Sequence, residues 1–327
     1  MLKRKSLISV VIPIAVLLGS CGANFQSVEN FSKSREIVGR ASNDFAEDIY
    51  QSCLRRTRYI KLVPDNGIPY RNDRRESCET TERVNSDNFK TVVSILIDYM
   101  DALGAIASGK NLSLDNSIDD LGESLKNLSI NTNKLDSDAV DGGSQILKVL
   151  FDLATKKIRE DALQKAIVCT NEPIHKYITG NSVPATDKNG VDLYKPAKGG
   201  LIFLVNDNYL SKNGNLGQET DAIDTYYKSY FLTLNELGKD KINPSNYQQV
   251  VERITVGEKL TIDYNKAMEI VADREQAARA YNQILVSTVK THNRLSKEFA
   301  EGLKPKDVNQ LCQFNTKVSF KKIDEKK

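Results

Sequence analysis

The sequence predicts a mainly α-helical fold, an elongated antiparallel helical bundle, and three observations support this class. Residues 258–301 contain neither proline nor glycine, and their apolar side chains recur at helical spacing. Shorter segments near residues 27–57, 89–106 and 144–169 repeat this pattern. The chain has no tryptophan and only eight prolines, whereas leucine, alanine, lysine and glutamate are abundant. Together these features predict one long helix with several shorter helices packed along it.

The first part of the chain is predicted to form two helices separated by a loop. In residues 27–57 the apolar side chains fall on one helix face: Phe31, Val38, Ala41, Phe45, Ile49 and Cys53. The stretch from Val63 to Ser77 has two prolines, an Asp-Asn-Gly turn signal and several charges, and it predicts an exposed loop. A second apolar stripe runs from Phe89 to Ile106, with Ser86 as the N-cap and Gly109 as the C-cap.

The middle of the chain is less regular. A weak helix is predicted within residues 114–128 and a strong helix over residues 144–169. Residues 171–217 predict an irregular insertion, because glycine, proline and asparagine are dispersed among short apolar runs. Within it, Lys188 to Val191 is typical of a hairpin turn, since Asn-Gly tolerates positive φ angles. The run from Leu201 to Val205 is compatible with either a strand or a helix.

Helical order returns in the last third of the chain. A stripe of five apolar residues ends at Gly238: Ile223, Tyr227, Tyr230, Leu234 and Leu237. Asn243 and Pro244 then predict a cap followed by a first-turn proline. The helix of residues 258–301 would be a rod roughly 66 Å long at 1.5 Å per residue. A rod of this length favours coiled-coil-like packing.

The first 21 residues have the order of an export signal. Three basic residues precede an apolar stretch of 12 residues, Leu7 to Leu18, which is shorter than the roughly 20 residues that span a bilayer. Leu18-Gly19-Ser20-Cys21 resembles the lipobox of bacterial lipoproteins. The resemblance implies diacylglyceryl transfer to the Cys21 thiol, cleavage before Cys21 and usually acylation of the new amino terminus. An ordinary secretory signal with a chance cysteine is the alternative.

The organisation of the chain follows from this signal. Residues 1–20 are predicted to be a cleaved signal peptide, and residues 21–26 a short linker to the anchor. Residues 27–320 then form a single bundle domain that contains the insertion 171–217, and residues 321–327 form a charged tail. Gly22 stands where an Asp resembles an inner-membrane retention signal. By the sorting rule of enteric-type bacteria, the absence of Asp at this position favours the outer membrane facing the periplasm, with the cell surface and the inner membrane as alternatives.

The charge balance argues against nucleic acid as a partner. Removing residues 1–20 takes away three of the 46 basic residues and none of the 43 acidic ones, which leaves 43 of each. Phosphate backbones are bound by concentrated positive charge, and this chain has no net excess. The basic clusters Arg55-Arg56 and Arg71 to Arg75 are interpreted as solvated loop ends.

Four cysteines remain after Cys21. An even number in an exported chain predicts two disulfides with three possible pairings, and no C-x-x-C pair suggests a redox or zinc site. If the first two helices are antiparallel, Cys53 and Cys78 meet at one end of the bundle. Cys169 ends the third strong helix and Cys312 follows the long helix. We therefore favour the pairs Cys53–Cys78 and Cys169–Cys312 over four free thiols.

Two polar residues fall near the apolar stripe of the long helix, namely His292 and Arg274. One interpretation is a buried polar pair that binds a ligand or partner. The favoured interpretation places both at the edge of the stripe with their polar tips in water, because amphipathic side chains commonly extend in this way. The other histidine, His175, lies in no recognised motif.

No catalytic, cofactor or metal site is predicted. The segment with Asp136, Asp138 and Asp141 and the segment with Asp187, Asn189 and Asp192 hint at calcium loops, but neither has the spacing of an EF-hand. A capped turn is the favoured interpretation of each. Nucleophile elbows, Walker loops and dinucleotide-binding glycine motifs do not occur in the sequence.

One aromatic cluster is the candidate interface: Tyr226, Tyr227, Tyr230 and Phe231. Tyrosine is enriched at the energetic centres of protein interfaces. The same residues keep helical spacing, so packing in the core is the competing interpretation.

The sequence as a whole predicts a lipid-anchored envelope protein that binds rather than catalyses. A scaffold for an envelope protein partner is the first hypothesis. A carrier that holds a small or lipidic ligand between helices is the second. An enzyme with an unrecognised site is the third and is disfavoured by the missing motifs.

The lipoprotein assignment has a direct test. Replacing the acyl acceptor, Cys21→Ala, is expected to abolish membrane attachment and the incorporation of labelled palmitate, because stable anchoring needs two or more acyl chains. Fractionation of cells fed labelled palmitate measures both. Labelled palmitate in the variant protein would contradict the assignment.

Overall fold

The computed structural model describes residues 25–61, 67–110, 129–130, 133–155, 160–180, 184–186, 192–194, 199–237 and 247–313. The predicted signal peptide and lipobox lie outside the described residues, as do the weak helix of residues 114–128, the Lys188–Val191 turn and the charged tail.

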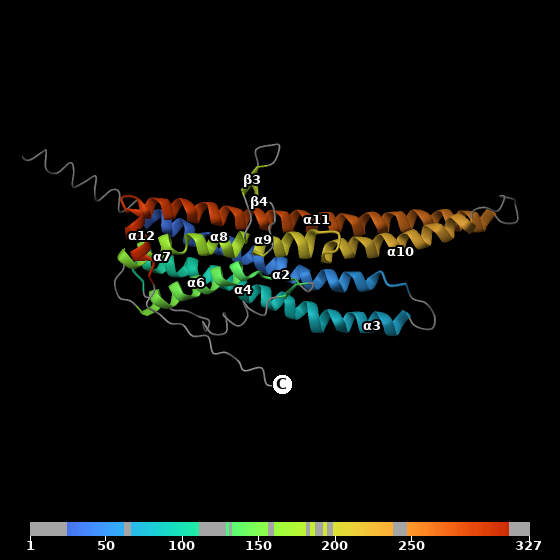
Figure 1. The fold of residues 1–327 in the computed structure, drawn as a ribbon. Coiled ribbons are helices and arrows are strands. Elements are labelled where there is room, and N and C mark those ends of the chain that lie inside the picture. The colour runs from blue at the N-terminus through green and yellow to red at the C-terminus, as the bar shows by residue number, and fades with distance from the viewer. Residues whose placement is uncertain are drawn as a thin grey trace, which may run out of the picture.

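The fold is an elongated bundle of helices, as predicted (Figure 1). Its longest element is α11 (Tyr247–Ala300), whose 54 residues correspond to roughly 80 Å. The helix begins 11 residues earlier than the predicted start at residue 258 and continues through Gly257. A single glycine inside a helix costs about 1 kcal/mol, which is too little to end a helix that packs along its length.

The first part of the chain forms an antiparallel pair of helical segments. A helix of residues 25–33 leads through Ser34 into α2 (Arg35–Arg58). The chain returns through α3 (Gly67–Ser77), the π-helical segment η1 (Cys78–Glu82) and α4 (Arg83–Ala107). The predicted loop from Val63 to Ser77 is therefore wrong for its second half. Pro69 lies in the first turn of α3, where a missing N–H breaks no helical hydrogen bond.

Both predicted disulfides are present. Cys53 and Cys78 join α2 to η1 with their Cα atoms 5.7 Å apart. Cys169 and Cys312 join the end of α7 to the end of the short helix α12 (Pro305–Leu311), with Cα atoms 5.3 Å apart. The second bond ties the segment after α11 back to the bundle.

The predicted strong helix over residues 144–169 corresponds to α6 (Ser137–Thr155) and α7 (Glu160–Cys169). The backbone N–H of Ala139 donates to Asp136 Oδ1 at 2.8 Å, which confirms a capped turn at Asp136. Gly142 permits close packing of α6 on α8, because a Cβ there would lie 2.5 Å from the carbonyl oxygen of Pro173.

The insertion 171–217 is more helical than predicted. It contains α8 (Asn171–Thr179), α9 (Leu201–Phe203) and the π-helical segment η2 (Leu204–Leu210). The predicted hairpin is present as β3 (Pro184–Thr186) paired antiparallel with β4 (Asp192–Tyr194). A second short hairpin pairs β1 (Ser129–Ile130) with β2 (Asn133–Lys134).

Aromatic side chains from four elements meet in the core. The ring of Phe45 on α2 lies 5.1 Å from Phe89 on α4, 5.0 Å from Tyr209 on η2 and 5.3 Å from Tyr281 on α11. All four residues are buried. Burial of this kind contributes roughly 1.5–3 kcal/mol per large apolar side chain, so the contact holds these elements together.

His292 is fully buried, so the interpretation that placed its polar tip in water is wrong. Its Nε2 lies 2.8 Å from the hydroxyl of Tyr99, and its Nδ1 lies 3.3 Å from Oδ1 of Asn171. Burial lowers the pKa of His292 to about 3. A neutral ring that accepts from Tyr99 and donates to Asn171 satisfies both nitrogens.

None of the described helices is both long enough and apolar enough to cross a membrane.

The buried His292 predicts an acid-sensitive contribution to stability. The unfolded chain takes up a proton near pH 6.5, whereas the folded chain does so near pH 3. Stability is therefore lost as the pH falls through this window, by up to about 1.4 kcal/mol per pH unit. In urea unfolding at pH 7, 5.5 and 4, the stability advantage of the native chain over His292→Gln should shrink with each step. A constant difference across the three pH values would contradict this assignment.

Candidate functional site

The four candidate interface residues lie on α10 (Asn215–Leu237). They belong to an aromatic cluster that joins three helices, hereafter the tyrosine cluster: Tyr59, Tyr226, Tyr227, Tyr230, Phe231 and Tyr264. The Tyr227 ring lies 5.6 Å from Tyr264 on α11 and 6.2 Å from Tyr59 on α2. Tyr227 is buried, whereas the other five are partly exposed. Packing in the core therefore describes Tyr227, and the others form a half-exposed surface around it.

A groove of about 870 Å³ runs beside the tyrosine cluster. Its apolar wall includes Tyr227, Phe231 and Leu232, and its polar side includes Asp221, Asp224 and Lys228. The Tyr264 hydroxyl donates to Asp224 Oδ1 at 2.9 Å, and this hydrogen bond raises the pKa of Tyr264. The groove therefore offers an aromatic surface with acidic groups along its edge.

The helices α10 and α11 extend beyond α2 and α3 at one end of the bundle (Figure 1). We call this two-helix projection, α10 with residues 247–271 of α11, the arm. Six of the ten exposed large hydrophobic side chains in the described residues lie on the arm: Leu232, Val251, Ile254, Val256, Ile262 and Ile270.

Part of this apolar surface has no partner within the bundle. At 3.6 residues per turn, Val251, Ile254 and Ile262 fall within roughly 80° of arc on α11. The opposite face of the same helix carries the buried Ala267 and Val271. The exposed stripe therefore points away from the bundle.

A buried ion network lies where the arm joins the bundle. The Arg55 guanidinium sits between two carboxylates, with its Nη1 2.7 Å from Asp48 Oδ1 and its Nε 2.6 Å from Glu219 Oε1. Tyr209 donates its hydroxyl to Asp48, and the half-exposed Arg274 lies 3.4 Å from the same carboxylate. Burial alone lowers the pKa of Arg55, but the hydrogen bonds to Glu219 and Asp48 outweigh it and raise the pKa overall.

The interpretation of Arg55-Arg56 and Arg71 to Arg75 as solvated loop ends is wrong in two respects. Both clusters lie on helices, since α2 continues to Arg58 and α3 spans Gly67–Ser77. Arg55 is also largely buried within the network. Its partner Asp48 lies seven residues earlier, two turns along the same helix face. Arg274 and His292 occupy separate sites on α11 and do not form the buried polar pair of the alternative interpretation. Arg274 is half-exposed, as the favoured interpretation expects.

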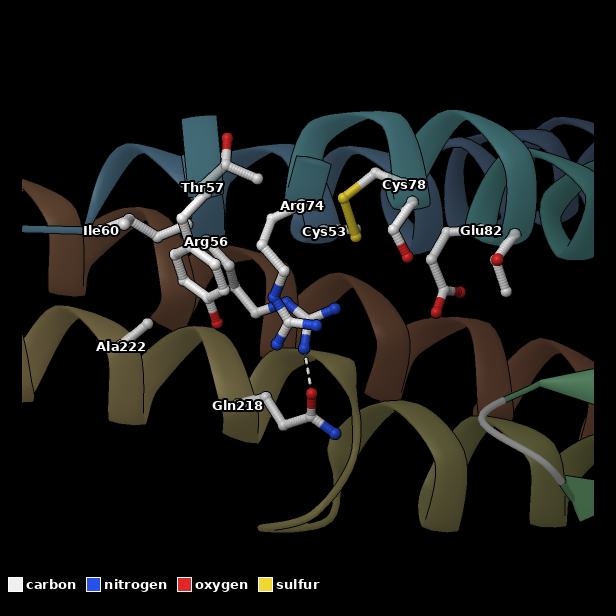
Figure 2. Close-up of a pocket in the computed structure, with 12 residues that line it drawn as sticks. Cys53, Arg56, Thr57, Ile60, Arg74, Cys78, Glu82, Gln218 and Ala222 are labelled. Carbon is white, nitrogen blue, oxygen red and sulfur yellow. Dashed lines mark hydrogen bonds between the residues drawn. A yellow bond between two sulfur atoms is a disulfide. The ribbon is translucent and has the colours of Figure 1, made fainter. Parts of the chain in front are cut away.

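Arg56 lines a pocket of about 380 Å³ between α2, α3 and α10 (Figure 2). Its guanidinium donates to Oε1 of Gln218 and shares the pocket with that of Arg74. The Cys53–Cys78 disulfide forms part of the wall. Sequence reasoning did not single out this arginine pocket. The available signal was the placement of Arg56 and Arg74 one helical turn from the two cysteines.

The calcium hypothesis gains no support. Among the described residues, no three histidine, cysteine or acidic side chains are grouped to hold a metal ion. Asp136 acts as a cap, and Asp187 and Asn189 lie outside the described residues.

Comparisons with protein-family models, with curated proteins and with solved structures found no match for this chain. Function is therefore argued from the geometry of its own residues.

The ion network predicts that replacing Arg55 destabilises the fold far more than replacing the nearby Arg58. Replacing Arg55 by Met leaves Asp48 and Glu219 buried without their counter-charge and should cost about 3–5 kcal/mol of unfolding free energy. Replacing the exposed Arg58 by Met, one turn further on, should change stability by less than about 0.5 kcal/mol. Urea unfolding with both disulfides intact compares the two. Equal losses would contradict the proposed role of Arg55.

Proposed function

We propose that this protein is a lipid-anchored helical scaffold of the bacterial cell envelope that binds an envelope protein partner through the arm. The observation that carries the proposal is the unpartnered apolar stripe of Val251, Ile254 and Ile262. Val251 and Ile254 lie one turn apart, and Glu258 separates them from Ile262 on the same face. Exposed apolar side chains gathered on one face favour an interaction surface. The half-exposed tyrosine cluster and its groove give the arm a second apolar surface, on α10.

The position of the anchor supports a scaffold role. Only three residues separate Cys21 from residue 25, the first described residue of the N-terminal helix. A chain of that length spans at most roughly 15 Å, so the acylated end would stay close to the bundle. Phe31, on this first helix, lies with its ring 5.6 Å from that of His292 near the C-terminal end of α11.

The arm lies at the other end of the same helix. Ile254 precedes His292 by 38 residues, which corresponds to roughly 57 Å along a continuous helix. A rigid rod of this kind would present the apolar stripe at a fixed distance from the membrane-anchored end. Such a separation suits a protein that holds a partner away from the bilayer.

The lipidic form of the carrier hypothesis has less support. The pockets beside the tyrosine cluster and beside the disulfide are lined by charged side chains, among them Asp221, Lys228 and Arg74. A lipidic ligand favours a predominantly apolar cavity.

The arm assignment is tested by crosslinking in cells. A photo-reactive amino acid at position 254 or 262 should crosslink to one discrete envelope protein. The same group at position 37 or 84 should not, although Ile37 and Val84 are exposed to a similar extent, 52% and 50% against 59% and 53%.

A double variant that introduces negative charge into the stripe completes the test. Ile254→Asp with Ile262→Asp should reduce partner capture at least tenfold, because burying two carboxylates in an apolar contact is costly. The matched control is Ile37→Asp with Val84→Asp, which should bind normally. Both variants should melt like the native protein, since surface substitutions rarely change stability by more than about 0.5 kcal/mol. Normal capture by the arm variant would overturn the proposal.

A further inference from the structure

The pocket beside the Cys53–Cys78 disulfide brings together two cationic side chains from different helices. Arg56 follows Cys53 by three residues on α2, and Arg74 precedes Cys78 by four residues on α3. Residues three or four apart share a helix face, so each arginine lies one turn from the disulfide. The disulfide, with its Cα atoms 5.7 Å apart, holds the two turns together although the guanidinium groups repel each other.

These two guanidinium groups differ from that of Arg55 in their surroundings. Arg56 donates to the neutral amide of Gln218, and Arg74 lies 5.7 Å from the ring centroid of Tyr70. Within the part of the chain that the structure describes, neither forms an ion pair with a carboxylate. Burial lowers the pKa of Arg56 most strongly; the charges of Glu82 and Glu219 raise this pKa, and the charge of Arg74 lowers it. The pair therefore has unsatisfied positive charge.

One carboxylate, Glu82, lies among the described residues that line the pocket. It stands on the far side of the disulfide from the two arginines (Figure 2). Its Oε2 lies within 3.3 Å of Asn85 Nδ2 and 3.5 Å of Asn215 Nδ2. Counting Glu82 with Arg56 and Arg74, the pocket keeps one formal positive charge.

We infer that this pocket binds the phosphate group of a small soluble ligand through Arg56 and Arg74. Guanidinium groups bind phosphate oxygens in bidentate fashion, and two of them match the charge of a phosphate dianion. Two hydroxyl side chains, Ser77 and Thr81, also line the pocket and are suited to the remaining oxygens, whereas the Thr57 hydroxyl donates to the carbonyl of Leu54. The volume of about 380 Å³ is near the lower end for ligand sites, which favours a small ligand. The inference concerns a site separate from the arm and does not depend on the proposed scaffold role.

Calorimetric titration of the oxidised full chain with inorganic phosphate tests the inference. The native protein should bind saturably in a chloride buffer of constant ionic strength. Arg56→Gln and Arg74→Gln should each weaken binding at least tenfold. The matched control is Arg75→Gln, which removes an exposed positive charge one residue from Arg74 and should bind like the native protein.

Thermal melting separates loss of the site from loss of the fold. Both glutamine variants relieve a like-charge repulsion, so without phosphate they should melt at the native temperature or above it. The rise in melting temperature that phosphate gives the native protein should be absent from both. The double variant Cys53→Ala with Cys78→Ala keeps both arginines and should also bind at least tenfold more weakly below its melting transition.

Two outcomes would overturn the inference. The first is no binding of phosphate, or equal binding by Arg74→Gln and Arg75→Gln. The second is capture of phosphatidylglycerol vesicles without binding of inorganic phosphate, which would assign the pocket to a lipid headgroup.

Discussion

The arrangement of the whole molecule depends on the buried ion network at the junction of bundle and arm. Arg55 binds Asp48 on its own helix and Glu219 on α10, while Tyr209 on η2 and Arg274 on α11 contact the same Asp48. Three elements therefore meet at the Asp48 carboxylate, and a fourth, α10, meets the Arg55 guanidinium beside it. Buried charges tolerate little displacement, because an unpaired one loses solvation without compensation. The network consequently fixes how α10 leaves the bundle, and with it the direction of the arm.

The adjacent residue shows how one step along a helix changes the chemistry. Successive positions differ by about 100° around the axis, so Arg55 and Arg56 face different surroundings. Arg55 is neutralised by two carboxylates, whereas Arg56 faces a pocket with a second arginine. Two identical side chains thus serve different purposes: one orients helices, and the other is available to an anion.

The sequence predicted those features that depend on local periodicity. The apolar stripes located α2, α4, α10 and α11. The predicted stop at Gly238 lies outside the described residues. The antiparallel first pair was enough to assign Cys53 to Cys78. The helix α3 was missed because proline, glycine and charge dominate its sequence, and its large apolar side chains, Ile68 and Tyr70, are exposed and form no buried stripe.

The candidate sites were harder to predict because their partners are distant in sequence. Arg55 and Glu219 are separated by 164 residues, so no local sequence pattern predicts that Arg55 is buried. His292 meets Tyr99 across 193 residues, and a polar residue at the edge of a stripe has the same periodicity whether it is buried or exposed. The exposed stripe on α11 was not predicted from the sequence, for a different reason. Apolar residues on both faces of a helix blur its periodicity, and only the packing shows which face is covered.

The disulfides relate the predicted location of the protein to the proposed phosphate site. Structural disulfides persist in oxidising compartments, which is where a chain with the predicted export signal would fold. Arg56 and Arg74 repel each other, and of the contacts described between their two helix turns the covalent one is the strongest. In a reducing compartment this repulsion would favour separation of α3 from α2, because few side-chain hydrogen bonds remain between them and one of these, from Arg71 to the carbonyl of Arg58, is exposed to solvent. Under the proposed export, the Cys53–Cys78 bond would form in the oxidising compartment, and the arginine pocket would be assembled together with it.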